Sequence, residues 1–237
     1  MESILTPSWK DYSKPYKIFG PLMTLNSVRS KIDRDGYAYY KPKDASTLQK
    51  LVNYSYEFLS APHVNLGRDG DVCPFVGHAL EKHTLRLTLT ECQTAIEARD
   101  AISEMIAIFE DMPISGSQSC PVTGNDHIYK SILIGFPRVS RNEAPFTIDA
   151  LQAELKTQFI SKGMMIGQFH PACPEPGLRN PNFRPLQAPV PMLVIRYLTK
   201  YDLPFMTSKY DHLESFANVM GEEGRRRIDA LLKKTFQ

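Results

Sequence analysis

The stretch that decides the fold is Thr84-Leu-Arg-Leu-Thr-Leu-Thr90, in which apolar and polar residues alternate. This alternation is typical of a half-buried β-strand. Residues 93–111 follow with helical spacing, and Pro113 ends the pattern. The apolar stripe of that helix consists of Ala95, Ile96, Ala98, Ile102, Met105, Ile106 and Phe109. A strand followed by an amphipathic helix is therefore the first unit of the predicted fold.

Further helices and strands are predicted on both sides of this unit. Strands are expected at residues 129–136, 164–169 and 192–198, and helices at residues 45–60, 148–162 and 209–235. Asp44 and Thr147 are candidate helix caps, and Gly163 is placed to end a helix. The order predicts an α+β fold, with a mixed or antiparallel sheet of about four to six strands and helices mainly on one face.

The first 43 residues differ from the remainder in composition. Four prolines lie too close together for long helices, and lysine and tyrosine are frequent: the prolines are Pro7, Pro15, Pro21 and Pro42. We expect an extended, Pro-rich N-terminal arm over residues 1–43, followed by a single α+β domain over residues 44–237.

The charge balance excludes several classes of partner. The 237 residues include 28 basic and 26 acidic ones, so the net charge is only +2. No overall field favours nucleic acid or an anionic membrane, and the run Arg225-Arg226-Arg227 fits a solvated helix face.

No stretch resembles a secretion signal or a membrane span. The sequence predicts a cytoplasmic protein, and an exposed sheet face would allow a homodimer.

The cysteines are Cys73, Cys92, Cys120 and Cys173, and their spacing fits neither a zinc motif nor a disulfide scaffold. Cys73 precedes Pro74, which has no N–H to engage the sulfur, just before a possible helix start. A thiolate presented in this way is one means of holding haem iron. A small buried thiol at a strand-to-helix turn is the other interpretation.

A histidine at the end of a strand is the second candidate. His170 follows the strand at 164–169 and precedes Pro171, so its imidazole would project into a loop-built site. A neutral imidazole there could bind haem or non-haem iron, or it could be a hydrogen-bonded structural residue. His78 and His83 are five residues apart, which is a weak metal signal.

Arginines cluster in or beside the same loops, where they could bind carboxylates by two parallel hydrogen bonds: Arg138, Arg141, Arg179, Arg184 and Arg196. A cofactor with two propionates, or an amino-acid substrate, needs such groups. Ordinary surface pairing is the alternative for any one of them.

Three blocks carry a resemblance to known families. Val72-Cys-Pro-Phe-Val-Gly-His-Ala-Leu, Gly163-Met-Met-Ile-Gly-Gln-Phe-His-Pro and residues 184–198 look like the signature blocks of an uncharacterised family found near natural-product pathways. The Cys-Pro-Phe block, with Pro-Arg-Val-Ser-Arg at 137–141, is also distantly similar to the YqcI/YcgG family. Some members of that family are haem-dependent N-hydroxylases of arginine-like guanidines.

The resemblance implies a haem iron that activates oxygen or peroxide beside a small polar substrate. The implied roles are His170 as metal ligand with Cys73 as the alternative, Arg138, Arg184 and Arg196 at the cofactor, and His170 with Arg141 in catalysis. We expect a haem-dependent oxygenase or oxidase, a monooxygenase of secondary metabolism, that takes electrons from a donor protein or uses peroxide.

Two other functions remain open from the residues. The first is a cofactor-free isomerase, cyclase or dehydratase that uses His170 with Glu175 or Asp202 as acid and base. The second is a non-catalytic module that binds another protein through its Pro-rich arm and the loop at residues 171–191.

Overall fold

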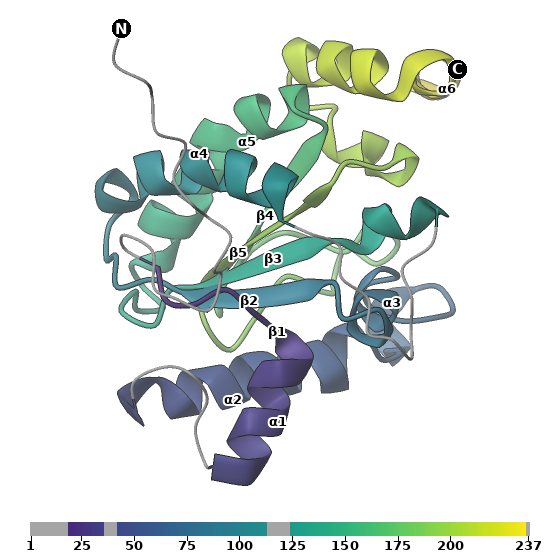
Figure 1. Ribbon diagram of the computed structural model, residues 1–237. Helices are drawn as coiled ribbons and strands as arrows, with labels where there is room; N and C mark the ends of the chain where they lie inside the picture. The colour runs from purple at the N-terminus through teal and green to yellow at the C-terminus, as the bar shows by residue number, and fades with distance from the viewer. Residues whose placement is uncertain (1–18, 36–41, 113–123, 236–237) are drawn as a thin grey trace, which may run out of the picture.

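A five-stranded mixed sheet forms the centre of the computed structural model, which describes residues 19–35, 42–112 and 124–235 (Figure 1). Its strand order is β1-β2-β3-β5-β4. The strands are β1 (Met23–Thr24), β2 (Leu85–Leu89), β3 (Ser131–Gly135), β4 (Met164–Phe169) and β5 (Met192–Tyr197). β2 and β3 are parallel, and every other neighbouring pair is antiparallel.

The parallel pair requires a long crossover, because two parallel strands cannot be joined by a tight turn. α4 (Ala95–Asp111) provides it. Thr94 caps the start of α4 by accepting a hydrogen bond from Glu97 N–H, and Lys130 donates to the carbonyls of Glu110 and Met112 at its end. The strand–helix–strand unit expected from residues 84–136 is confirmed.

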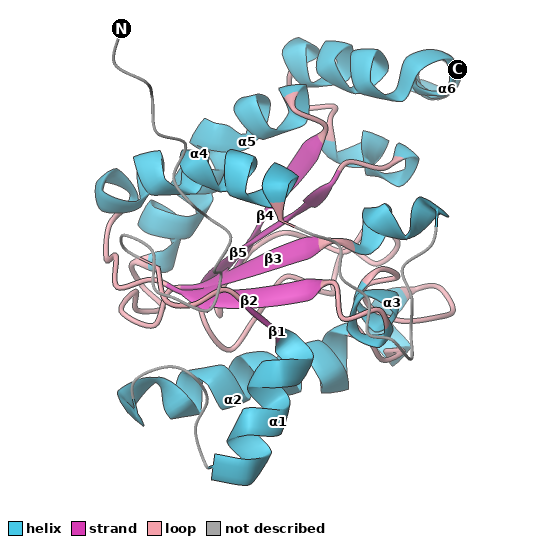
Figure 2. Ribbon diagram, in the orientation of Figure 1, coloured by secondary structure: helices cyan, strands magenta, loops and turns pink. Residues whose placement is uncertain are grey.

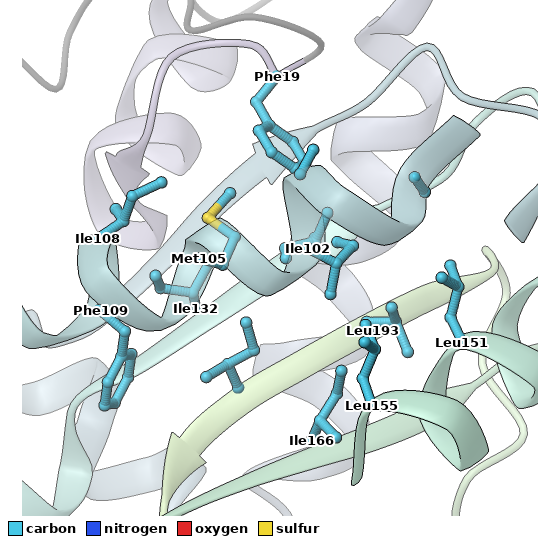
Figure 3. Packing of buried hydrophobic residues seen from close by; sticks show 14 of the residues in the cluster. Phe19, Ile102, Met105, Ile108, Phe109, Ile132, Leu151, Leu155, Ile166 and Leu193 are labelled. Atoms are coloured by element: carbon cyan, nitrogen blue, oxygen red, sulfur yellow. The ribbon is translucent and has the colours of Figure 1, made fainter. Parts of the chain in front are cut away.

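One face of the sheet is covered by α4 and α5 (Ala150–Ser161), which continues the π-helical turn η5 (Pro145–Asp149) (Figures 1 and 2). Isoleucines of β3, β4 and β5 pack against the apolar stripe of α4 on this face. The close-up in Figure 3 labels ten members of this core: Phe19, Ile102, Met105, Ile108, Phe109, Ile132, Leu151, Leu155, Ile166 and Leu193.

The opposite face is covered by α1 (Leu25–Asp35), α2 (Ala45–Asn53), the π-helical turn η2 (Tyr54–Leu59) and α3 (Val76–Glu81) (Figure 2). A second core lies there, with Leu85, Leu87, Leu133 and Met192 from the sheet. The α+β class and the mixed sheet are confirmed, whereas the expectation of helices mainly on one face is wrong. β3 and β5 carry apolar residues in consecutive positions, so both of their faces need cover.

The C-terminal part forms a third core. η6 (Lys200–Phe205) leads to α6 (Tyr210–Thr235), which is kinked at Gly221, where φ is 60°. Leu203, Met206 and Phe216 are buried here against Ile160 of α5. Three short 3₁₀ turns complete the described elements: η1 (Pro42–Asp44), η3 (Val64–Leu66) and η4 (Gly124–Tyr129).

The N-terminal arm is the main departure from the predicted elements. Residues 1–18 and 36–41 lie outside the described residues, but Met23–Thr24 pair with β2 and Leu25–Asp35 form α1 on α2. The extended arm is therefore wrong for residues 23–35, because Leu25, Val28 and Ile32 recur at helical spacing and are buried.

Two predicted caps are also wrong. Asp44 makes no capping hydrogen bond and pairs with Arg138 instead. Thr147 lies inside η5, where its hydroxyl donates to Gln93 O. Gly163 does end α5, with φ of 72°. In the described part of the chain, no helix combines the length and the apolar character that a membrane crossing demands.

A substitution at Gly67 would test how tightly the loop around this residue is packed. It follows η3 with φ of 74°, and a Cβ placed there would lie 2.9 Å from Arg179 Cβ. We expect Gly67→Ala to lower the free energy of unfolding by about 1–3 kcal/mol in urea denaturation. Gly70→Ala is the matched control, since φ is 85° but the nearest atom is Arg68 Nη1 at 3.6 Å. Equal losses in both variants would contradict the steric role of Arg179.

Candidate functional site

His170 is completely buried, and both nitrogens of its ring are engaged. Nε2 lies 3.0 Å from Asp149 Oδ1, and Nδ1 accepts a hydrogen bond of 3.3 Å from Ala172 N–H. This pattern assigns the neutral tautomer with the proton on Nε2. A metal would have to displace one of these bonds. His170 thus has the geometry of a structural residue, which was the alternative interpretation of its sequence context.

The same residue starts the long loop between β4 and β5, and contacts from both helical layers hold this loop. Asp149 reaches His170 from η5, at the start of α5. On the other side, the hydroxyl of Tyr54 in η2 donates to Pro185 O at 3.2 Å. Backbone bonds from Ala188 N–H and Cys173 N–H to His170 O close the base of the loop. The loop at residues 171–191 is therefore packed onto the body of the protein.

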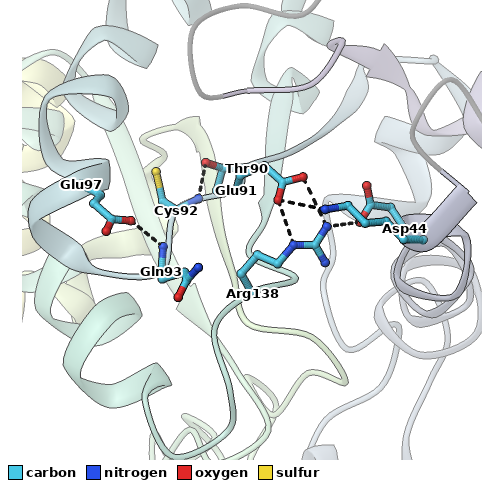
Figure 4. A network of polar contacts seen from close by, with 8 residues as sticks. Asp44, Thr90, Glu91, Cys92, Gln93, Glu97 and Arg138 are labelled. Atoms are coloured by element: carbon cyan, nitrogen blue, oxygen red, sulfur yellow. Dashed lines mark hydrogen bonds and ion pairs between the residues drawn. The ribbon is translucent and has the colours of Figure 1, made fainter.

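Arg138 belongs to a network of charged side chains at the opposite end of α2 from Tyr54 (Figure 4). Its Nε and Nη2 donate to Glu91, and Nη2 also donates to Asp44 at 2.8 Å. The hydrogen bond from Arg138 is the main reason why the pKa of Glu91 falls to about 2. Lys43 contacts Glu91 as well. These contacts use the donors that a cofactor propionate would need.

The hydrogen-bond donors of Arg196 are also occupied by a carboxylate of the chain. Its two terminal nitrogens donate to the two carboxylate oxygens of Asp202, at 2.8 and 2.5 Å. The Asp202 side chain is only 2% exposed and also accepts from the backbone and hydroxyl of Thr199. A buried carboxylate without a partner would be costly, so this pair stabilises η6 and β5. The guanidinium also stacks 5.0 Å from the centre of the Phe75 ring.

Two of the remaining predicted arginines, Arg184 and Arg141, are less constrained. Arg184 folds back to donate through Nη1 to the carbonyls of Pro181 and Phe183, while its Nε and Nη2 have no partner among the described residues. Arg141 is exposed in the turn between β3 and η5. The structure therefore does not gather the predicted arginines around one centre.

Cys73 is partly exposed, whereas Cys92 and Cys173 are buried. Burial, with the nearby carboxylates Asp149 and Glu175, raises the pKa of Cys173 to about 11, so its thiol stays protonated. The backbone of Cys73 is fixed by hydrogen bonds from its N–H to Leu59 O and from Val76 N–H to its carbonyl. Among the described cysteines, Cys73 is the one placed to act chemically. Cys120 lies outside the described residues.

Cys73 contributes to the pKa shifts of two other residues, Arg196 and Tyr54. Burial, the largest effect, lowers the pKa of Arg196, but Asp202 and, to a smaller extent, Cys73 raise it. Burial first, and then the charge of Cys73, raises the pKa of Tyr54 far above its ordinary value. Cys73 therefore lies within electrostatic reach of both the Arg196 guanidinium and the Tyr54 hydroxyl.

Cys73 shares the second core with Tyr54, Phe58 and Phe183, which belong to a group of aromatic rings that the sequence reasoning missed. Tyr54 stacks on Phe58 at 5.2 Å, and His63 stacks on Phe183 at 4.6 Å with Phe58 near both. His63 Nδ1 accepts from Asn65 N–H, and its Nε2 has no partner among the described residues. We call Cys73 and these four residues the thiol–aromatic cluster. The run Tyr54-Ser-Tyr-Glu-Phe58 before Pro62-His63 was the signal available in the sequence.

The structure offers no preformed metal centre in the residues that it describes: no group of three or more His, Cys, Asp or Glu side chains could hold an ion. The predicted ligands Cys73 and His170 lie on two separate segments, Cys73 before α3 and His170 after β4. They do not form a common ligand set.

The structural role of His170 is directly testable. His170→Ala would leave Asp149 and Ala172 N–H without their partner, so we expect a loss of about 2–3 kcal/mol in the free energy of unfolding. Asp149→Ala should be strongly non-additive with it in a double-mutant cycle. His78→Ala, at an exposed histidine, should change stability little. A stable His170→Ala variant would contradict this role.

No curated protein and no solved structure matches this chain significantly. One family model does match, over residues 48–230, which include most of α2, all of α3, strands β2 to β5 and most of α6. The chain therefore belongs to the family described as domain of unknown function DUF6875.

Proposed function

We propose that this chain is a haem-dependent oxidoreductase in which Cys73 holds the iron and the thiol–aromatic cluster receives the macrocycle. The observation that carries the proposal is the position of Cys73, which is partly exposed, is fixed by its backbone and shares a core with Tyr54, Phe58 and Phe183. Cysteine thiolate is an established axial ligand of haem iron. The distant resemblance to the YqcI/YcgG family supports the same cofactor.

The residues fit the cofactor at three points. Pro74 cannot donate a hydrogen bond to the Cys73 sulfur, and the Arg196 guanidinium lies within electrostatic reach of it. The rings of Phe58 and Phe183 offer apolar contact to a planar group. Arg184 is the arginine with donors left for a propionate, because Arg138 and Arg196 are held by carboxylates.

When bound, haem would supply the activation of oxygen or peroxide, with a donor protein as the source of electrons in the first case. The chain's own residues would orient the substrate. Neutral His63 carries its proton on the free Nε2, because Nδ1 accepts from Asn65, so it can donate a hydrogen bond to a bound polar group. The substrate class is a small polar metabolite of secondary metabolism, amino-acid-derived compounds included, and the proposed location is the cytoplasm.

His63 also favours a second candidate, a metal-free acid–base enzyme. Two of the three residues that the sequence offers for it, His170 and Asp202, are poorly suited, since His170 has no free nitrogen and Asp202 is paired with Arg196. His63 has a free Nε2 and lies in the same aromatic group as Tyr54 and Phe58. An enzyme of this kind would be colourless and would keep its activity without metal.

A visible absorption spectrum of protein expressed with a haem precursor separates the two candidates. We expect a Soret band that shifts on reduction, and a carbon monoxide spectrum typical of thiolate ligation. Cys73→Ala should remove that thiolate signature and lower haem content at least tenfold. Cys92→Ala, at a buried cysteine on the other side of the sheet, should retain both.

The pattern of the variants decides the assignment. Haem retained in full by Cys73→Ala, with an unchanged carbon monoxide spectrum, would remove Cys73 from the ligand position. A colourless but folded wild-type protein would remove haem itself, and His63→Ala would then become the variant to assay for loss of acid–base activity.

A further inference from the structure

A second buried histidine lies outside the thiol–aromatic cluster, between α5 and α6. His212, in the first turn of α6, is 2% exposed, and its Nε2 lies 3.0 Å from Thr157 Oγ1 of α5. Its Nδ1 is buried without a hydrogen-bond partner among the described residues. Buried polar atoms are almost always paired, so an unpartnered one requires an explanation.

The unpartnered nitrogen is tolerable only while the ring is neutral. A neutral imidazole can leave Nδ1 as an acceptor lone pair, whereas the protonated ring carries N–H donors on both nitrogens. One of those donors would then be a buried, charged and unpaired group, which is strongly unfavourable. The surroundings of His212 therefore select the neutral form by geometry alone.

The charges around the His212 ring also favour its neutral form. Burial is the main cause that lowers the pKa of His212, and Lys156 of α5 and Lys209 in the preceding turn lower it further. Asp211 opposes them, but its side chain is exposed. Lys156 is held close because its Nζ donates to Phe205 O at 2.8 Å. A proton on His212 would therefore add a third positive charge beside two lysines.

We propose that His212 is a proton-sensitive latch, in which protonation of its imidazole releases the first half of α6, residues 210–220, from α5. The released state lets the charged ring reach water and separates it from Lys156. This inference stands on the α5–α6 contact alone and does not depend on the proposed haem chemistry.

Release would not remain confined to α6. Phe216 of α6 shares the third core with Leu203 and Met206, which belong to η6 or follow it directly. η6 also carries Asp202, the partner of Arg196. Opening of the latch would thus loosen the segment that fixes the guanidinium next to Cys73, and so couple the pH to the region of the thiol.

The sign of the pH dependence follows from linkage. The pKa of His212 is lower in the docked state than the ordinary value of about 6.5 that it regains on release. The released state then binds more protons, so docking is fully stable above about pH 6.5 and weakens as the pH falls toward the docked-state pKa. One proton gives at most about a tenfold change in the docking equilibrium per pH unit.

Hydrogen exchange measured by mass spectrometry tests the latch in the full chain. Between about pH 7.5 and pH 5.5, exchange in residues 210–220, corrected for intrinsic rates, should rise by up to about tenfold per unit within the window, with residues 95–111 as reference. His212→Gln cannot titrate and should abolish the rise. An equal rise in wild type and His212→Gln would overturn the proposal.

If residues 210–220 are released from α5 at every pH in His212→Gln, a second variant still tests the proposal. Lys156→Gln retains a donor for Phe205 O but removes a charge that opposes protonation, so the pH response should become smaller. An undiminished response would contradict the latch. His78→Gln, at a half-exposed histidine, should respond like wild type, and loss of its response would show that His212 is not the sensor.

Discussion

Burial of both faces of β3 and β5 is the constraint on which the rest of the structure depends. Neighbouring residues such as Ile132 and Leu133 point to opposite sides, and both are buried. Neither strand can therefore face water, and two helical layers are required. One layer comes from α4 and α5, and the other must be recruited from the N-terminal segment, which is why α1 and α2 pack beneath the sheet.

The two layers in turn hold the long connection between β4 and β5. Each contributes one polar side chain from a π-helical turn: Asp149 of η5 on one face and Tyr54 of η2 on the other. A π-helical turn adds a residue and redirects the side chains around it, and such turns are frequent at functional sites. His170 and Pro185 receive these contacts, so the loop rests between the layers as a fixed part of the domain.

The periodicity of apolar residues predicted most of the helices and strands, because each helix or strand is encoded by its own local sequence. The alternation at Thr84–Thr90 and the apolar stripe of α4 were sufficient for β2 and α4, and β4 lies where it was expected. The site could not be predicted to the same degree. Whether His170 binds a metal or Asp149 depends on a contact between residues 21 positions apart, and no local pattern encodes that contact. The stacking of His63 on Phe183 spans an even longer separation.

The sequence also could not show which arginines are free to bind a ligand, and the reason is energetic. Sequence suggested that Arg138 and Arg196 were free for a carboxylate ligand, but each faces a carboxylate of the chain that is itself buried, Asp44 or Asp202. Removing a guanidinium from such a carboxylate would leave an unpaired buried charge, so a ligand cannot compete for it at small cost. A bound anion must instead use donors that folding leaves unused, and in the thiol–aromatic cluster and the adjoining loop these include His63 Nε2 and the remaining nitrogens of Arg184.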